Sequence, residues 1–133
     1  MADRELYTLL EKAEVEIENK EKFQNLIENL KKVLWELPKQ IFSNSISKEL
    51  LIKFGKLIGT GQKREEIIFL QTLTSLVERG AYETNENEPN SLFQIFEQCG
   101  LITKLEMIVG NSKTNYEAKN AIIIIISLLN KSK

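Results

Sequence analysis

Histidine is absent from the 133 residues, and cysteine and aspartate each occur once, as Cys99 and Asp3. Without histidine, a serine or cysteine nucleophile would lack its usual general base. A lone cysteine cannot form an internal disulfide, and we interpret Cys99 as a packing residue. Hard metal ions favour loops rich in aspartate, and the sequence has no such loop. We therefore expect no enzyme, no metal site and no other cofactor.

Strong net charge and long apolar runs are also missing. The formal net charge is −1 and the basic residues do not cluster, so nucleic-acid binding is not expected. The longest strictly apolar run, residues 121–126, is far shorter than the roughly 20 residues that cross a bilayer, so we expect no membrane span. The first ten residues are charged and lack the apolar core of a secretory signal. This pattern predicts an intracellular location, cytoplasmic, nuclear or both.

With only two prolines and six glycines, the chain offers long stretches in which helices can form. Apolar residues recur in these stretches at spacings of three and four, which indicates helices with one buried face. A slip in phase between Ile17 and Phe23 indicates a break near residues 19–22, with a single long helix as the alternative. We predict Gly80 as the C-terminal cap of the fourth helix. The expected helices lie at about 3–18, 21–37, 50–58, 62–79, 92–99, 101–109 and 115–130.

Five consecutive isoleucines, residues 122–126, fit either a buried strand or a buried helix by periodicity alone. Thr114 and Glu117 have the spacing of a capping box, which favours a helix, and a lone strand would leave its backbone unpaired. Neighbouring residues of a helix point about 100° apart, so five in a row cannot all face one core. We expect Ile124, Ile125 and Leu128 to pack on the preceding helices. Ile122 and Ile126 would then face either a partner or the N-terminal helices of this chain.

Two parts of the chain resemble each other when one is shifted by 51 residues. The shift places Gly59 on Gly110, and Leu70 on Ala121. Each part then consists of a short helix, a glycine turn and a long helix. A spacing of 51 exceeds the roughly 40–47 residues of armadillo and HEAT repeats, and a polar loop at 82–90 accounts for the difference.

Residues 91–129, SLFQIFEQCGLITKLEMIVGNSKTNYEAKNAIIIIISLL, resemble the final armadillo repeat of the importin-α (karyopherin-α) nuclear import adaptors. The resemblance implies an all-α, armadillo/HEAT-like right-handed helical stack of about seven helices. Residues 1–133 would form a single helical domain. Its parts would be an N-terminal helical pair (1–40), an armadillo-like repeat (45–81), the polar loop (82–90) and a terminal armadillo-like repeat (91–131).

Importin-α proteins bind basic localisation signals with Trp and Asn side chains spaced four residues apart on their long helices. The matching positions here are Gln71 and Ser75 in one repeat, and Ile122 and Ile126 in the other. None of them is Trp or Asn, so binding of localisation signals is not expected. The resemblance still implies a non-catalytic interaction module whose concave face binds a protein or peptide partner. The candidate partner-binding residues are Gln71, Ser75, Asn120, Ile122, Ile126 and Trp35.

The apolar stripe of residues 3–37 allows a second function. Its spacing is similar to that of a heptad repeat, and Trp35 lies near its end. Two copies could assemble through this stripe, which would make the chain a self-associating helical bundle and a homo-oligomer. Trp35 would then be an interface anchor, whereas in a monomer it fits the edge of the core.

Overall fold

The structure is a computed structural model, and it describes residues 2–84, 88 and 90–130. Within these residues the chain forms eight helices and no strand, which confirms the all-α prediction. None of the eight helices is both long and apolar enough to cross a membrane. The helices are α1 (Ala2–Val15), α2 (Lys20–Glu36), α3 (Lys39–Ser45), α4 (Lys48–Ile58), α5 (Arg64–Glu83), α6 (Phe93–Gln98), α7 (Leu101–Gly110) and α8 (Tyr116–Leu129).

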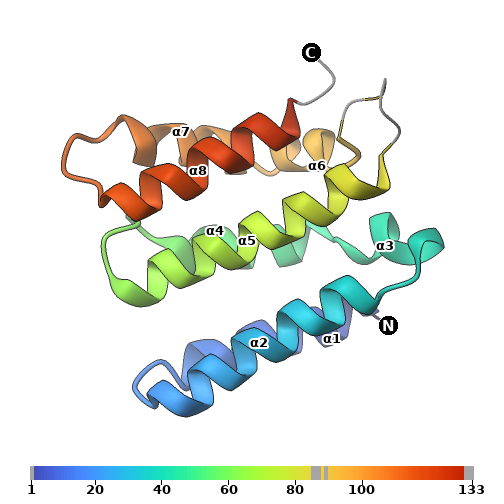
Figure 1. The fold of residues 1–133 in the computed structure, drawn as a ribbon, viewed down its shortest axis with the longest axis horizontal. Coiled ribbons are helices and arrows are strands. Elements are labelled where there is room, and N and C mark those ends of the chain that lie inside the picture. Colours follow the sequence, from blue (N-terminus) through green and yellow to red (C-terminus); the bar gives the residue numbers. More distant parts are fainter. Residues whose placement is uncertain (1, 85–87, 89, 131–133) are drawn as a thin grey trace.

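Six of the helices form three antiparallel hairpins, α1/α2, α4/α5 and α7/α8, stacked one on another (Figure 1). The stacking produces two layers. Helices α2, α5 and α8 run in the same direction in the front layer of Figure 1, and α1, α4 and α7 lie behind them. The short helices α3 and α6 connect successive hairpins at one end of the stack.

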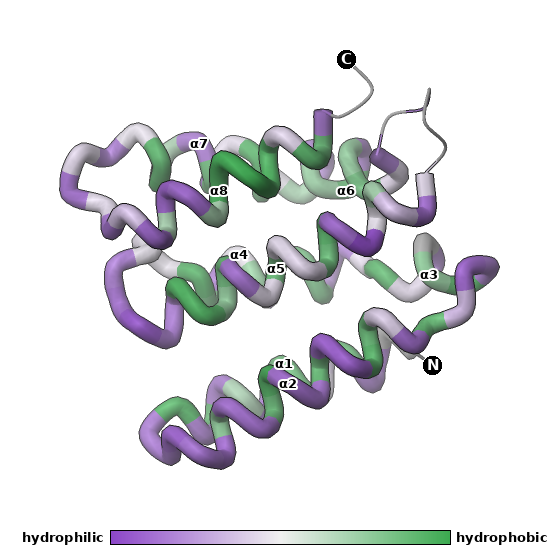
Figure 2. Tube along the Cα trace, in the orientation of Figure 1, coloured by the Kyte–Doolittle hydropathy of each residue, from purple (hydrophilic) through white to green (hydrophobic). Residues whose placement is uncertain are grey.

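The core lies between the two layers. Figure 2 shows hydrophobic residues on the sides of the helices that face one another and hydrophilic residues on the outer sides. Four phenylalanines, Phe42, Phe54, Phe69 and Phe96, are fully buried. The predicted stripes of residues 3–37 are buried inside the chain as well, because α1 and α2 pack on each other and on the next hairpin.

Most of the predicted helix boundaries are close to those in the structure. The predicted break near residues 19–22 is confirmed, and Asn19 caps α2 by accepting a hydrogen bond from the Lys22 amide at 3.1 Å. Helix α3 was not predicted, because only Ile41 and Phe42 give it apolar character, and it raises the number of helices to eight. The predicted polar loop at 82–90 lies partly in α5, and residues 85–87 and 89 lie outside the described residues.

The prediction that Gly80 ends a helix is wrong. Helix α5 continues to Glu83, and Gly80 is buried within it. A Cβ atom at this position would lie 2.7 Å from Asn90 Oδ1 and 2.8 Å from Leu92 Cδ1. Position 80 is therefore occupied by glycine because the segment before α6 approaches the helix closely there. A left-handed conformation at a helix end is not the reason.

Candidate binding face

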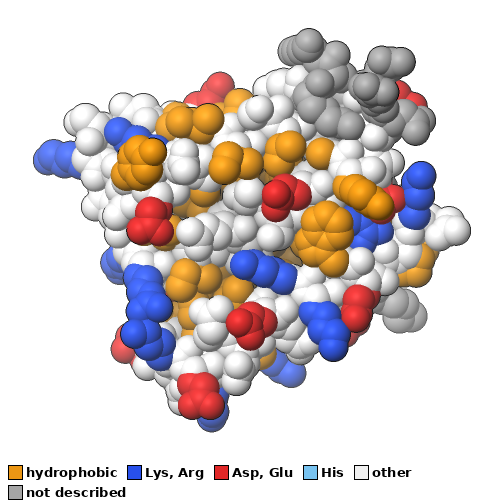
Figure 3. Space-filling view, viewed as in Figure 1, with side chains coloured by type: hydrophobic (Ala, Val, Ile, Leu, Met, Phe, Trp, Pro, Cys, Tyr) orange, Lys and Arg blue, Asp and Glu red, His pale blue; other side chains and the backbone are white. Residues whose placement is uncertain are grey.

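The front layer presents one continuous face made by α2, α5 and α8, which we call the α2/α5/α8 face (Figure 1). The central helix contributes residues at spacings of three and four. Their positions point outward because Leu70, Leu73 and Val77, on the other side of α5, are fully buried. Figure 3 shows separate groups of hydrophobic side chains on this face, interspersed with charges of both signs. The stripe on α5 consists of Arg64, Ile68, Gln71, Ser75, Glu78 and Tyr82.

A hollow of about 300 Å³ lies between α5 and α8 on this face. Gln71 enters it from α5 and Asn120 from α8, and both side chains are exposed. Among the described residues, neither of these two side-chain amides makes a hydrogen bond within the chain. Both retain donors and acceptors for a ligand. The hollow is lined by Gln71, Thr74, Tyr116, Glu117, Asn120, Ala121 and Ile124.

A second hollow of about 540 Å³ adjoins the first, because Gln71 and Glu117 line both. It lies where α5 and α8 begin. Arg64 and Glu117 place opposite charges at its rim, and Gln24 of α2 and Gln62 add further amides. The two hollows together reach all three helices; the larger is lined mainly by polar groups, and the smaller is lined mainly by apolar surface with the amides of Gln71 and Asn120 beside it.

An aromatic pair marks the other end of α2 and α5. The rings of Trp35 and Tyr82 meet edge to face with their centroids 6.1 Å apart. Trp35 is 44% exposed and Tyr82 is 78% exposed, so both offer apolar surface to solvent. The guanidinium of Arg79 lies 5.8 Å from the Trp35 ring and 4.8 Å from the Phe42 ring. Trp35 is thus held at the edge of the core by contacts within the chain.

Four of the six predicted residues lie on the α2/α5/α8 face. Gln71 and Asn120 share the smaller hollow, Ser75 is partly exposed one turn further along α5, and Trp35 belongs to the aromatic pair. The prediction that Ile122 faces a partner is wrong, because its side chain is 0% exposed. It is covered by the core beneath α8, which packs mainly on α5 and α7. Ile126 is partly buried.

A one-residue error of register explains the misplacement of Ile122. The caps of the two long helices, Lys63 and Asn115, are 52 residues apart, whereas the predicted shift was 51. Asn115 Oδ1, not Thr114, accepts the capping hydrogen bond, from the Glu117 amide at 2.7 Å. One residue rotates a helix position by about 100°. With a shift of 52, buried residues coincide in four pairs: Phe69 with Ala121, Leu70 with Ile122, Leu73 with Ile125, and Val77 with Leu129.

The run of isoleucines forms part of α8, as predicted, but its sides are assigned differently. Ile125 is fully buried and Leu128 is partly buried, as expected. Ile124, expected to be packed, is 41% exposed and lines the smaller hollow. Tyr116, 77% exposed, is a further residue of this hollow that the sequence pattern did not indicate. A shift of 52 aligns Tyr116 with the exposed Arg64, but it aligns Ile124 with the buried Thr72, so the repeat alone would not have placed Ile124.

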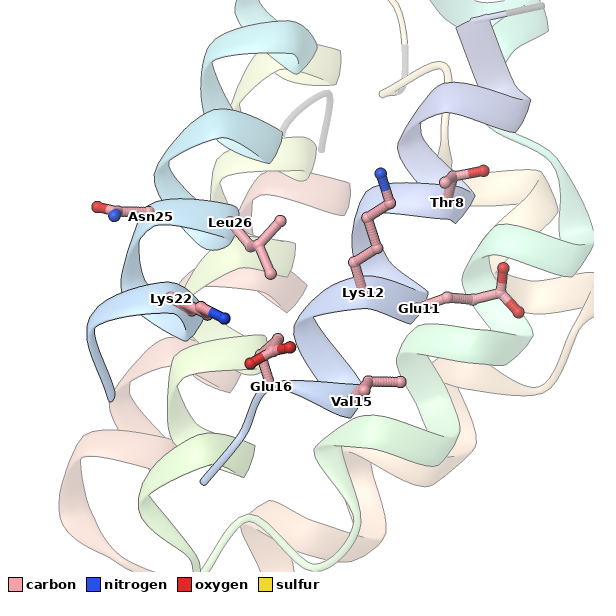
Figure 4. Close-up of a pocket in the computed structure, with 8 residues that line it drawn as sticks. All are labelled: Thr8, Glu11, Lys12, Val15, Glu16, Lys22, Asn25 and Leu26. Atoms are coloured by element: carbon pink, nitrogen blue, oxygen red, sulfur yellow. The ribbon is translucent and has the colours of Figure 1, made fainter. Parts of the chain in front are cut away.

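A wider hollow of about 660 Å³ lies between α1 and α2, at the N-terminal edge of the stack (Figure 4). Leu26 and Lys22 of α2 point toward α1, whereas Asn25 points away from it. Apart from Leu26 and Val15, every side chain around this hollow is polar or charged. Its full lining is Thr8, Glu11, Lys12, Val15, Glu16, Lys22, Asn25 and Leu26.

An ion pair joins α4 to α1. Lys53 Nζ lies 2.5 Å from Glu14 Oε1, and this hydrogen bond raises the pKa of Lys53. No three His, Cys, Asp or Glu side chains of the described part converge as they would around a metal ion. The Cys99 Sγ lies 3.5 Å from the Phe96 carbonyl oxygen and is partly buried.

No protein-family model matches the chain, and comparisons with curated proteins and with solved structures find no significant match.

Proposed function

We propose that the chain is a non-catalytic protein-interaction module that binds an extended peptide segment of a partner across the α2/α5/α8 face. The observation that carries the proposal is the pair of free amides, Gln71 and Asn120, at one hollow beside Tyr116 and Ile124. An extended peptide leaves its backbone N–H and C=O groups unpaired, and a side-chain amide can donate to one and accept from the other. Tyr116 and Ile124 would contact an apolar side chain of the peptide.

The order of the helices supports an armadillo-like stack. A short, a medium and a long helix follow one another twice: α3, α4 and α5 have 7, 11 and 20 residues, and α6, α7 and α8 have 6, 10 and 14 residues. Helices α1 and α2 would then be the last two helices of a preceding unit. In this scheme the long helices line the concave side, which is the side that carries both hollows.

The partner differs from the basic localisation signals that importin-α proteins bind. With the shift of 52, the two pairs of signal-binding positions fall at Gln71 and Ser75 and at Ile123 and Ser127. These residues lack the Trp and Asn that clamp a basic peptide. We therefore expect a partner peptide that is uncharged or of mixed charge, with at least one apolar anchor residue.

Selection from a displayed library of random peptides tests this proposal directly. Three helices at 8–10 Å spacing span about 25 Å, which an extended peptide of about eight residues covers. Peptides enriched on the folded chain should bind at least ~tenfold more weakly to the variants Gln71→Ala and Asn120→Ala. Gln94→Ala, an exposed amide on α6, is the matched control and should bind normally. Selected peptides that bind both hollow variants as well as the wild type would refute the proposal.

A further inference from the structure

One side of α8 is turned away from the rest of the chain. Asn120 and Ile124 line the hollow shared with α5, and Ile122 and Ile125 lie in the core. Since a helix advances about 100° per residue, the remaining side of α8 points away from α5, at the free edge of the stack (Figure 1). The residues on this side, which we call the α8 edge row, are Lys119, Ile123, Ile126 and Asn130.

The α8 edge row is more apolar than the corresponding row of α5, on the side next to α8. With the shift of 52, it corresponds to Ile67, Gln71, Thr74 and Glu78, of which Ile67 is buried, Thr74 is partly buried, and Gln71 and Glu78 are exposed. That row has one aliphatic residue, whereas the α8 edge row has two. Ile123 is 57% exposed and Ile126 is partly exposed. Stacked helical repeats need a polar outer side at a free end, so this edge has the composition of a covered surface.

The opposite edge of the stack is different. The outward positions of α1 and α2 include Lys12, Lys22 and Asn25, which surround the 660 Å³ hollow (Figure 4). Stacking the α8 edge row on this edge, which also exposes Val15, would remove charged side chains from water, which is unfavourable. A head-to-tail array of copies is therefore disfavoured.

We propose that the α8 edge row binds the same row of a second copy of this chain, with the two α8 helices antiparallel about a two-fold axis. The row reads polar, apolar, apolar, polar, and it is symmetric about the point between Ile124 and Ile125. Antiparallel pairing about that point places Ile123 against Ile126 of the second copy. The same pairing places Lys119 beside Asn130 of the second copy, so the row is complementary to itself.

Charge also favours the antiparallel arrangement. Within Tyr116–Leu129 the last turn of α8 contains no basic residue, so a cation brought there by a second copy would interact favourably with the negative end of the helix dipole. In the pair, Lys119 of each copy lies at the C-terminal end of the other copy's α8. Asn130 Nδ2 donates to the Ile126 carbonyl oxygen at 3.0 Å, which leaves Asn130 Oδ1 as an acceptor for that lysine. An edge of two short helices is small for an interface, so we expect a dissociation constant of order micromolar.

Sedimentation velocity of the full chain between about 1 and 200 µM measures this dimer on either side of its expected dissociation constant. Ile123→Lys should weaken dimerisation by about tenfold or more, because a charge replaces an apolar contact in both copies. Val15→Lys is the matched control. Val15 is 78% exposed at the opposite edge, so this change should leave the dimer intact. Circular dichroism of each variant verifies that the fold is retained.

A charge exchange tests the antiparallel register. Lys119→Glu should weaken the dimer because it places an acid at the negative, C-terminal end of the other copy's α8. Asn130→Lys should weaken it because it places a lysine beside Lys119 of the other copy. The double variant, which combines Lys119→Glu with Asn130→Lys, brings an acid and a base together across the interface and should recover most of the affinity. The two positions lie about 16 Å apart within one helix, so recovery cannot arise within a single copy.

Three results would overturn the proposal. A chain that remains monomeric at about 200 µM has no such dimer. A dimer that Val15→Lys weakens and Ile123→Lys does not would be assembled through the N-terminal edge. A double variant no tighter than the single variants would exclude the antiparallel register. Peptide binding is tested separately by Gln71→Ala and Asn120→Ala, and none of the dimer variants changes a residue that lines the two hollows.

Discussion

Replacing Arg79 with alanine is expected to cost about 3–5 kcal/mol of folding stability, because a buried charged network would lose its only cation. Arg79 is 3% exposed. Its Nη1 donates to the Leu34 carbonyl oxygen at 2.9 Å, its Nη2 to the Leu37 carbonyl oxygen at 2.5 Å, and its Nε to Glu83 Oε1 at 2.9 Å. One side chain of α5 therefore satisfies carbonyls at the end of α2, which no intrahelical donor can reach.

The magnitude follows from these contacts. A hydrogen bond that involves a charged group contributes about 1.5–3 kcal/mol, and the alanine variant loses three of them. It also leaves the Glu83 carboxylate, whose side chain is 11% exposed, without its cation. Partial entry of water and relaxation of Glu83 reduce the total to the range observed when buried ion pairs are broken, about 3–5 kcal/mol. A chain of this length has a total stability of roughly 7–20 kcal/mol, so the variant should still fold.

Urea denaturation followed by circular dichroism measures the loss, and the fluorescence of Trp35, the sole tryptophan, reports locally on the same network. Arg79→Lys should lose an intermediate amount, because an ammonium cannot reach two carbonyls and a carboxylate at once. Arg64→Ala, an exposed arginine at the start of the same helix, should change stability by less than about 0.5 kcal/mol. A loss below about 1 kcal/mol for Arg79→Ala would refute the stabilising role assigned to the guanidinium.

Three further perturbations have defined outcomes. The pKa of Lys53 is raised by Glu14 from its ordinary value of 10.5, so the pair stabilises the fold below that pH and the stabilisation is lost as pH rises through the folded-state pKa. Lys53→Met should accordingly lower the free energy of unfolding by about 0.2–1 kcal/mol at neutral pH. Urea denaturation should show that the difference between wild type and variant disappears above pH 10.5. A difference that does not depend on pH would contradict the pairing. Native labelling of Cys99 by a thiol reagent should be at least ~tenfold slower than that of an unfolded control, and equal rates would place the thiol on the surface. Gly80→Ala should lower thermal stability by about 1–2 kcal/mol, because two side chains would crowd the added Cβ. Gly110→Ala is the control and should not lower it, because nothing lies within 4 Å of a Cβ there. A stabilised Gly80→Ala would show that the crowding relaxes freely.

Periodicity of apolar residues was sufficient to predict seven of the helices, because each has one side that a neighbouring helix covers. Helix α3 has no such stripe, and Pro38 indicates only where α2 stops and not that a new helix follows. The role of Arg79 could not be predicted either. It stands among the apolar residues of α5, and nothing in the sequence shows that the carbonyls of Leu34 and Leu37 lie beside it.

The candidate face was predictable in its helices but not in all of its residues. Gln71 was indicated by its alignment with a signal-binding position of the importin-α repeats, and Asn120 was indicated as a polar neighbour of the isoleucines. Ile122 was misplaced because its side depends on a register that is sensitive to a single residue, whereas the exposure of Ile124 follows from neither shift. Amphipathic helices match one another at several shifts, so apolar spacing does not distinguish 51 from 52, whereas the capping residues Lys63 and Asn115 do.

Obstruction of the α2/α5/α8 face is the most direct test of the proposed function. Ser75 is partly exposed in the middle of α5, between the hollows and the aromatic pair, and an arginine there would extend across the face. Ile52→Arg, at a 46% exposed position on α4 in the other layer, is the control. Proximity labelling in cells should identify the same partners for the intact chain and for Ile52→Arg, and these partners should be lost with Ser75→Arg. Both variants should retain the melting temperature of the intact chain. Partners that persist with Ser75→Arg and disappear with Ile52→Arg would place the binding surface on the other layer and contradict the account.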